Sequence, residues 1–256
     1  VLSHIILSMG YKLEHVFSNT KLEYPECISF AKKWCGKYGV KLTILTPKMS
    51  PIEIWKKYGY PMFSKESAEI LERLRHGHNC DPKKIKKIAY ILKRLGYKGD
   101  LNNTTKIKNF LRRNGIKVSA KCCEFLKKKP FQEWEKASGK KVAILGTRAA
   151  ESQIRRVVWV RKGCVYETKG KVVVTPLIFF TDEDIWKYIK RHRIKLADIY
   201  YKGIERNGCY CCGFGCHLRE DNNFVKLKQL NPNLWKNVMN HWGFEKICKK
   251  CKIKVE

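Results

Sequence analysis

A strand, a helix and a second strand follow one another within the first fifty residues, and this order constrains the fold more than any other feature. The apolar pattern of residues 12–19 predicts a buried strand. Residues 25–35 predict a helix, because Pro25 needs no amide partner in a first turn and Glu26 suits the helix dipole. Residues 41–46 predict the second strand. Such a unit places its strands parallel, so the sequence predicts an α/β protein with a parallel sheet.

The rest of the chain is predicted to extend this sheet and to cover it with helices. Apolar residues recur at helical spacing through residues 50–140, which we interpret as a helical insertion on the sheet. Further strands are predicted at residues 142–145 and 171–174. Thr181 followed by Asp184 matches a capping box, so a helix is predicted to begin at that point.

Two regions are therefore expected: an α/β domain over residues 1–205 and a cysteine-rich segment packed on it over residues 206–256. No apolar run approaches the roughly 18 residues that span a bilayer, and no secretory leader is recognisable. These features predict a cytoplasmic protein without a membrane partner.

The charge of the chain favours anionic partners. Lys and Arg number 54 against 23 Asp and Glu, which gives a formal net charge of +31. Such an excess favours nucleotides, sulfonucleotides, tRNA or DNA as partners. The alternative is a lysine-rich composition spread over solvated faces, and the scattered positions of the lysines do not decide between the two.

Polar residues follow two of the predicted strands, at the sheet edge where α/β proteins bind ligands. A glycine permits close approach of the backbone to an anion, and an arginine can hold phosphate or sulfate through two hydrogen bonds. Ordinary turn chemistry is the alternative interpretation. The candidate nucleotide or sulfate ligands are Ser18, Asn19, Thr20, Gly146, Thr147, Arg148, Glu151, Ser152 and Arg155.

The twelve cysteines are clustered, which favours metal ligands or redox thiols over a disulfide scaffold. An adjacent pair at Cys122 and Cys123, together with a C-x-x-C run from Cys209 to Cys212, offers the four thiolates that a 4Fe–4S cluster needs. Zinc is the alternative, although it more often uses spaced cysteine pairs. Cys211 and Cys216 would then be alternate ligands or free thiols.

Six segments of the chain together carry a resemblance to a known family: residues 17–26, 121–123, 128–131, 146–152, 176–186 and 208–215. They resemble the phosphoadenosine phosphosulfate (PAPS) reductase family of the adenine nucleotide alpha-hydrolase superfamily. The resemblance implies a Rossmann-like parallel sheet of the HUP type, an adenylylated substrate such as PAPS, adenylyl sulfate or ATP, and a thiol reductant protein as partner. It also implies that the cluster ligands are Cys122, Cys123, Cys209 and Cys212.

Two departures from this family bear on activity. The family's glycine-rich phosphate loop precedes the first helix, whereas this chain begins at Val1 inside that helix, so we expect weak nucleotide binding from the chain as given. Sulfonucleotide reductases also carry a nucleophilic cysteine near the C-terminus in a Glu-Cys-Gly pattern. The candidates here are Cys248 and Cys251, whose surroundings match that pattern poorly.

Three functions remain open at this point. The first is a sulfonucleotide reductase-like enzyme of sulfur metabolism, in which a thiolate attacks the sulfur of the substrate. The second is an ATP-dependent enzyme that adenylylates or thiolates nucleic acid, with pyrophosphate as the leaving group. The third is a non-catalytic fragment that carries a cluster.

Overall fold

The computed structural model describes residues 1–168, 170–205 and 207–256. The described residues form two compact units, each assembled from segments that are distant in sequence. Unit 1 comprises Val1–Phe17, Glu26–Leu45 and Phe131–Gly203, and unit 2 comprises Ser18–Pro25, Thr46–Pro130 and Ile204–Glu256.

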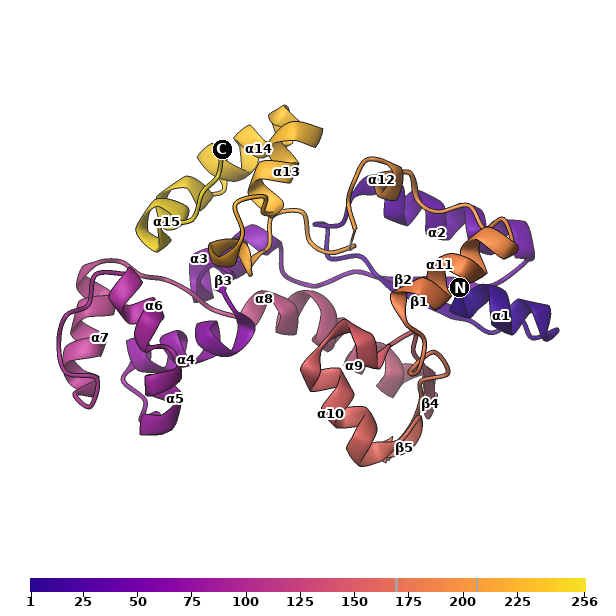
Figure 1. The fold of residues 1–256 in the computed structure, drawn as a ribbon, viewed down its shortest axis with the longest axis horizontal. Helices are drawn as coiled ribbons and strands as arrows, with labels where there is room; N and C mark the ends of the chain where they lie inside the picture. The colour runs from indigo at the N-terminus through magenta and orange to yellow at the C-terminus, as the bar shows by residue number, and fades with distance from the viewer. Residues whose placement is uncertain (169, 206) are drawn as a thin grey trace. The chain divides into compact units, whose positions relative to one another are not determined.

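Unit 1 combines helices with two small sheets (Figure 1). The helices are α1 (Leu2–Ser8), α2 (Pro25–Tyr38), α9 (Lys129–Ser138), α10 (Gln153–Lys162), α11 (Asp182–Arg191), α12 (Asp198–Tyr201) and the short 3₁₀ turn Ala149–Glu151. The strands are β1 (His15–Ser18), β2 (Leu42–Leu45), β4 (Val142–Ile144), β5 (Val165–Thr168) and β6 (Lys171–Val174). A few residues at the ends of β1, α2 and α9 are assigned to unit 2.

The strands of unit 1 pair in two sets. One sheet joins β1 to β2, and the other has the order β4-β6-β5. Strands β4 and β6 are parallel, with Val142 opposite Val172, as expected for strands joined through a helix. Strand β5 runs antiparallel to β6, with Val165 opposite Val174, and this antiparallel pair was not predicted from the sequence pattern.

Local sequence signals account for the helix boundaries. Thr181 and Asp184 form the predicted capping box at the start of α11: the Asp184 amide donates to the Thr181 hydroxyl over 3.1 Å, and the Thr181 amide donates to the Asp184 carboxylate over 2.8 Å. Helix α3 (Pro51–Tyr58) begins with the same arrangement at Ser50 and Glu53. Each box satisfies amides at the helix start that have no partner inside the helix.

Unit 2 is mainly helical (Figure 1). Its helices are α3 (Pro51–Tyr58), α4 (Lys65–His76), α5 (Pro82–Lys87), α6 (Ala89–Arg94), α7 (Thr104–Arg113), α8 (Lys121–Cys123), α13 (Asn223–Leu230), α14 (Pro232–Lys236) and α15 (Phe244–Cys251). Two π-helical turns, Glu124–Lys128 and Asn237–His241, and a 3₁₀ turn, Cys216–Leu218, complete them. Strands β3 (Met62–Phe63) and β7 (Gly213–Phe214) form a short parallel pair.

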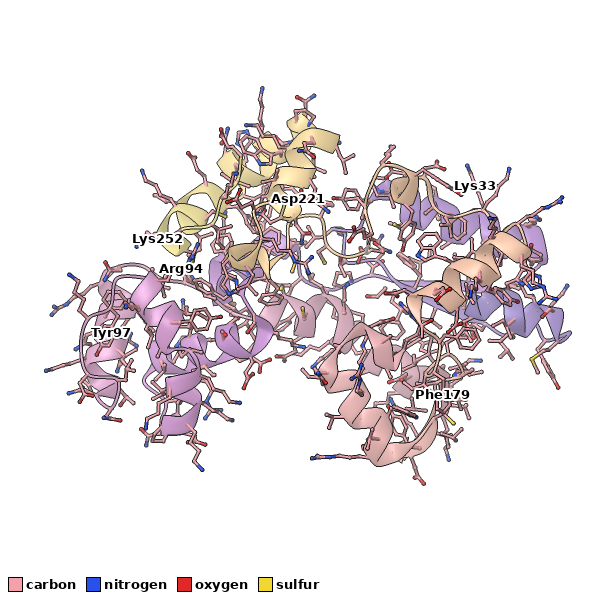
Figure 2. All side chains as sticks on the ribbon, in the orientation of Figure 1. Lys33, Arg94, Tyr97, Phe179, Asp221 and Lys252 are labelled. Atoms are coloured by element: carbon pink, nitrogen blue, oxygen red, sulfur yellow. The ribbon has the colours of Figure 1, made fainter. Side chains whose placement is uncertain are left out.

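An aromatic cluster forms the centre of unit 2. Trp55 on α3 meets Phe244 on α15 edge to face, with 4.9 Å between ring centroids. Tyr60 stacks on Trp55 and donates its hydroxyl hydrogen to the carbonyl of Trp242 over 3.0 Å. Residues 242–244 therefore pack against residues 55–60 in one core. Figure 2 shows a second link of this kind, in which Arg94 on α6 lies beside Lys252 and donates to its backbone carbonyl.

The predicted α/β class is confirmed, since described strands pair in parallel in both units and helices surround them. The predicted helical stretch at residues 50–140 contains α3 to α9 and the short strand β3. The predicted division at residue 205 stays a prediction, and residue 206 itself lies outside the described residues. Among the described residues, no helix is both long and apolar enough to cross a membrane.

Candidate functional site

Five cysteine side chains from two segments of unit 2 converge on one small pocket. Cys122 and Cys123 come from α8, and Cys209, Cys211 and Cys212 come from the loop before β7. The four cysteines predicted as cluster ligands are thus neighbours although 86 residues separate the two pairs. The rest of the lining is Leu22, Trp55, Pro61, Leu126 and Lys127.

The first cysteine pair sits at a change of helix type. Helix α8 ends at Cys123, and the following residues Glu124–Lys128 form a π-helical turn. Such turns interrupt α-helices mostly at functional sites, because the extra residue redirects the side chains that follow. The Ser18 hydroxyl donates to the Leu126 carbonyl over 3.1 Å, which ties this turn to the end of β1.

Backbone contacts hold the second cysteine segment in place. The Tyr210 amide donates to the Leu22 carbonyl over 2.9 Å, and the Asn223 side-chain amide donates to the Cys212 carbonyl over 2.8 Å. Gly213 pairs with Met62 in the β3–β7 ladder. A Cβ atom at Gly213 would lie 2.5 Å from the Pro61 carbonyl oxygen, so glycine is required where this strand leaves the cysteines.

The adjacent thiols differ in acidity. A hydrogen bond from Cys122 lowers the pKa of Cys123, and the positive charges of Lys65 and Lys127 lower it further. The same hydrogen bond and burial raise the pKa of Cys122. Burial also raises the pKa values of Cys209 and Cys212. Cys123 is therefore the most acidic thiol of the group and the one best suited to act as a thiolate.

Polar groups beside the pocket are arranged around Cys209. The fully buried Thr20 places its hydroxyl oxygen 3.7 Å from the Cys209 sulfur. Its amide donates to the Glu23 carboxylate over 2.8 Å, and that carboxylate lies 3.8 Å from the Lys127 ammonium group. Burial lowers the pKa of Lys127, but the combined charges of Cys209, Glu23, Cys123 and Cys212 raise it overall, so this side chain is a cation beside the thiols.

The residues of the pocket fit an iron–sulfur cluster in the type and number of their donors. Trp55 provides a second indication of a cluster site, because its indole N–H is buried and has no hydrogen-bond partner among the described residues. Sulfur atoms of a bound cluster would offer an acceptor to such a donor, and unpaired buried donors are rare in proteins.

The side chains are nevertheless packed closely. The pocket has a volume of about 20 Å³, which is room for about one water molecule. Among the described residues, no three His, Cys, Asp or Glu side chains are arranged so that they could hold a metal ion. A cluster would therefore require the two cysteine segments to separate.

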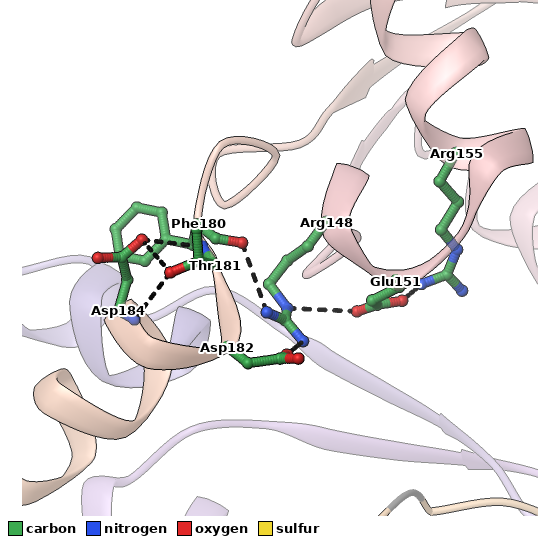
Figure 3. Close-up of polar contacts among 7 residues, drawn as sticks. All are labelled: Arg148, Glu151, Arg155, Phe180, Thr181, Asp182 and Asp184. Atoms are coloured by element: carbon green, nitrogen blue, oxygen red, sulfur yellow. Dashed lines mark hydrogen bonds and ion pairs between the residues drawn. The ribbon is translucent and has the colours of Figure 1, made fainter.

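The predicted anion ligand Arg148 belongs to unit 1 and is engaged in ion pairs (Figure 3). Its guanidinium group lies 2.6 Å from the Asp182 carboxylate and 3.5 Å from the Glu151 carboxylate, and it also donates to the Phe180 carbonyl over 3.4 Å. Glu151 pairs in addition with Arg155. The Arg148 side chain is 15% exposed, so an anion that reached it would compete with Asp182.

The remaining candidate ligands have structural roles in the loops where they were predicted. The Asn19 side chain accepts from the Lys21 amide over 3.0 Å, and the Ser152 hydroxyl caps α10 by accepting from the Arg155 amide over 3.3 Å. Gly146 and Thr147 lie in the loop that follows β4. The predicted nucleotide-binding role of these residues stays a prediction.

Cys248 and Cys251, the candidate nucleophiles, lie on the inner face of α15. Their exposed fractions are 1% and 0%. Burial raises the pKa of Cys251 to about 12 and raises that of Cys248 as well, so both are protonated thiols inside the core. Their predicted catalytic role stays a prediction, for which the structure provides no exposed thiolate.

The sequence did not single out three residues that line or border the pocket: Lys127, Glu23 and Trp55. Lys127 could have been found, because it follows Cys123 by four residues and one helical turn places it near the same face. Glu23 and Trp55 carried no such signal, since their proximity to the cysteines depends on contacts between distant segments.

Comparisons with known proteins identify the family to which the chain belongs. The phosphoadenosine phosphosulfate reductase domain matches residues 84–213. An uncharacterised protein of Methanocaldococcus jannaschii is 29% identical over 239 residues, which are 91% of this chain and 43% of that protein. An adenosine 5'-phosphosulfate reductase of Anoxybacillus flavithermus is 30% identical over 102 residues, 40% of this chain and 41% of that enzyme.

A phosphoadenylyl-sulfate reductase of Candida auris, solved as a phosphate complex, has a TM-score of 0.45 and 16% identity, and covers 80% of this chain and 73% of its own. The chain spans less than half the length of the two curated relatives described above. The matched domain nevertheless covers just over half of the chain, including Cys122, Cys123, Cys209 and Cys212. The chain therefore belongs to the phosphoadenosine phosphosulfate reductase domain family.

Proposed function

We propose that this chain contributes to sulfonucleotide chemistry, with a 4Fe–4S cluster held by Cys122, Cys123, Cys209 and Cys212 and an adenylylated or sulfated adenine nucleotide as substrate. The observation that carries the proposal is the convergence of the two cysteine pairs on one pocket. Membership of the family supports the substrate class, and the four thiols support the cluster.

The chain's own residues would prepare the pocket for an anionic centre. A bound cluster would supply a charged iron–sulfur centre whose properties depend on nearby hydrogen bonds and charges. Lys127 places a positive charge beside the thiols, and Glu23 lies close enough to hold that side chain in position. The Thr20 hydroxyl can donate to the Cys209 sulfur. The Lys127 cation would also favour an incoming sulfate or phosphate group.

Metal analysis of the wild-type protein tests the cluster. Protein purified without oxygen should be brown and should contain about four iron atoms and about four inorganic sulfides per chain. Mass spectrometry of the metals and a colorimetric sulfide assay measure both. Stoichiometric zinc with no iron would overturn the assignment and leave a structural metal site in its place.

Arg148 is expected to contribute strongly to nucleotide binding. Changing Arg148 to Ala should weaken binding of adenylyl sulfate by about 2–5 kcal/mol, because the phosphate or sulfate group would lose the charged partner that we propose for it in the complex. Isothermal titration of the full-length protein measures the loss.

Arg156→Ala is the matched control, since Arg156 is exposed on the next helix α10. Its affinity should stay close to that of the wild type. Equal affinities of the Arg148 variant and the wild type would show that the Arg148–Asp182 pair only supports the loop, and the nucleotide would then have to bind through other residues.

A further inference from the structure

The basic residues of this chain are not evenly distributed. Residues 82–117 contain twelve Lys and Arg residues and one acidic residue, Asp100, which gives this segment a net charge of +11. The segment is one seventh of the chain and carries more than a third of its net charge of +31. Residues 131–203 are twice as long, yet sixteen basic and eight acidic residues leave them only +8. A general lysine bias would not produce this difference.

The fold separates the apolar and basic residues of this segment. The isoleucine and leucine residues of α5, α6 and α7 are buried, including Ile85, Ile91 and Ile107, whereas Tyr90 on α6 is exposed. The basic side chains lie on the outside of the same helices and of the loop that joins them. The exposed members are Lys83, Lys84, Lys86, Lys87, Lys93, Lys98, Lys106, Arg112 and Arg113, which we call the basic face.

Few charges of the basic face are neutralised. Lys87 lies 3.3 Å from the Glu66 carboxylate, and both side chains are well exposed. Arg112 uses its Nε to donate to the Arg75 carbonyl over 2.9 Å, and it forms no ion pair with another described residue. Within the described part of the chain, no ion pair involves Lys83, Lys84, Lys86, Lys93, Lys98, Lys106 or Arg113.

The exposed side chains beside the basic face distinguish among three polyanions that it could bind: a membrane surface, a single-stranded nucleic acid and a duplex. Binding in a membrane interface needs several exposed apolar residues beside the basic ones, whereas the isoleucines and leucines of these helices are buried. Single strands are usually held by several aromatic platforms, and Tyr90 is the large exposed aromatic of this segment. Unpaired cations without such anchors suit the regularly spaced phosphates of a duplex.

We propose that the basic face of α5–α7 is a binding surface for duplex nucleic acid, which it contacts through the phosphate backbone without reading the base sequence. The proposal goes beyond the cluster and the sulfonucleotide chemistry and does not depend on either. It requires only that the lysines of α5 and the arginines at the end of α7 release the counterions of the duplex when they bind.

Fluorescence anisotropy with a labelled duplex of mixed sequence tests the surface. The triple variant Lys83→Glu, Lys84→Glu, Lys86→Glu should bind at least about tenfold more weakly than the wild type. Each lost phosphate contact should also lower the slope of log affinity against log salt by about one. The matched control Lys32→Glu, Lys33→Glu, Lys37→Glu makes the same charge change on exposed positions of α2 and should stay close to the wild type.

Each outcome decides the proposal. Equal losses in the two triple variants would overturn it, because binding would then reflect net charge alone. No binding by the wild type, or equal binding to phosphatidylserine vesicles, would overturn it as well. Parallel titrations with DNA and RNA duplexes identify the form of nucleic acid. Unchanged iron content and circular dichroism of the variant separate this surface from folding and from the cluster site.

Discussion

Serine at both Cys209 and Cys212 is expected to reduce the iron content of anaerobically purified protein to background. The two residues are half of the proposed ligand set, and a neutral hydroxyl is a poor substitute for a thiolate toward iron. Replacing both Cys122 and Cys123 by serine should likewise reduce the iron content to background. Metal analysis and the visible absorption spectrum measure the loss.

Two controls make this experiment specific. Cys211→Ser should keep its iron, although Cys211 lines the same pocket and is 1% exposed, because the ligand set pairs Cys209 with Cys212. Cys80→Ser removes a cysteine from unit 2 that lies outside the pocket and should also have no effect. If a Cys212→Ser variant kept its iron and the Cys211→Ser variant lost it, Cys211 would be the ligand in place of Cys212. Full retention in every variant would refute the site.

Replacing Phe244 by Ala is expected to lower the free energy of unfolding by about 3–5 kcal/mol, the usual range when a buried phenylalanine side chain is removed. Phe244 is fully buried, and its ring centroid lies 4.9 Å from that of Trp55, 5.1 Å from that of Tyr60 and 5.7 Å from that of Phe224. The change removes the contact that joins α15 to α3. Denaturant titration followed by tryptophan fluorescence measures the loss.

Leu218→Ala is the matched control for this prediction, because Leu218 is an apolar residue of unit 2 that is 73% exposed. Its free energy of unfolding should change by no more than about 0.5 kcal/mol. If both variants unfolded at the same denaturant concentration, residues 244–256 would not share a core with residues 51–63. The cysteine loop before β7 would then need another support.

Local signals in the sequence determined the elements that depend on neighbouring residues. The strands at β1 and β2, the helix between them and the capping box at Thr181 were predicted within a few residues, because each rests on contacts within a few positions of the chain. The clustering of cysteines likewise indicated a metal or redox site, since the spacing of such ligands is visible in the sequence itself.

Only the tertiary structure decided which of these residues meet. Twelve cysteines in the sequence offered many groupings, and the fold brings five of them to one pocket while it buries Cys248 and Cys251 in the core of unit 2. Arg148 was predicted to bind a phosphate or sulfate group, whereas the fold places the Asp182 carboxylate against it. Lys127, Glu23 and Trp55 gained their positions beside the thiols in the same way. These pairings join residues far apart in the chain, so packing and long-range hydrogen bonds select them, and no periodic pattern in the sequence encodes them.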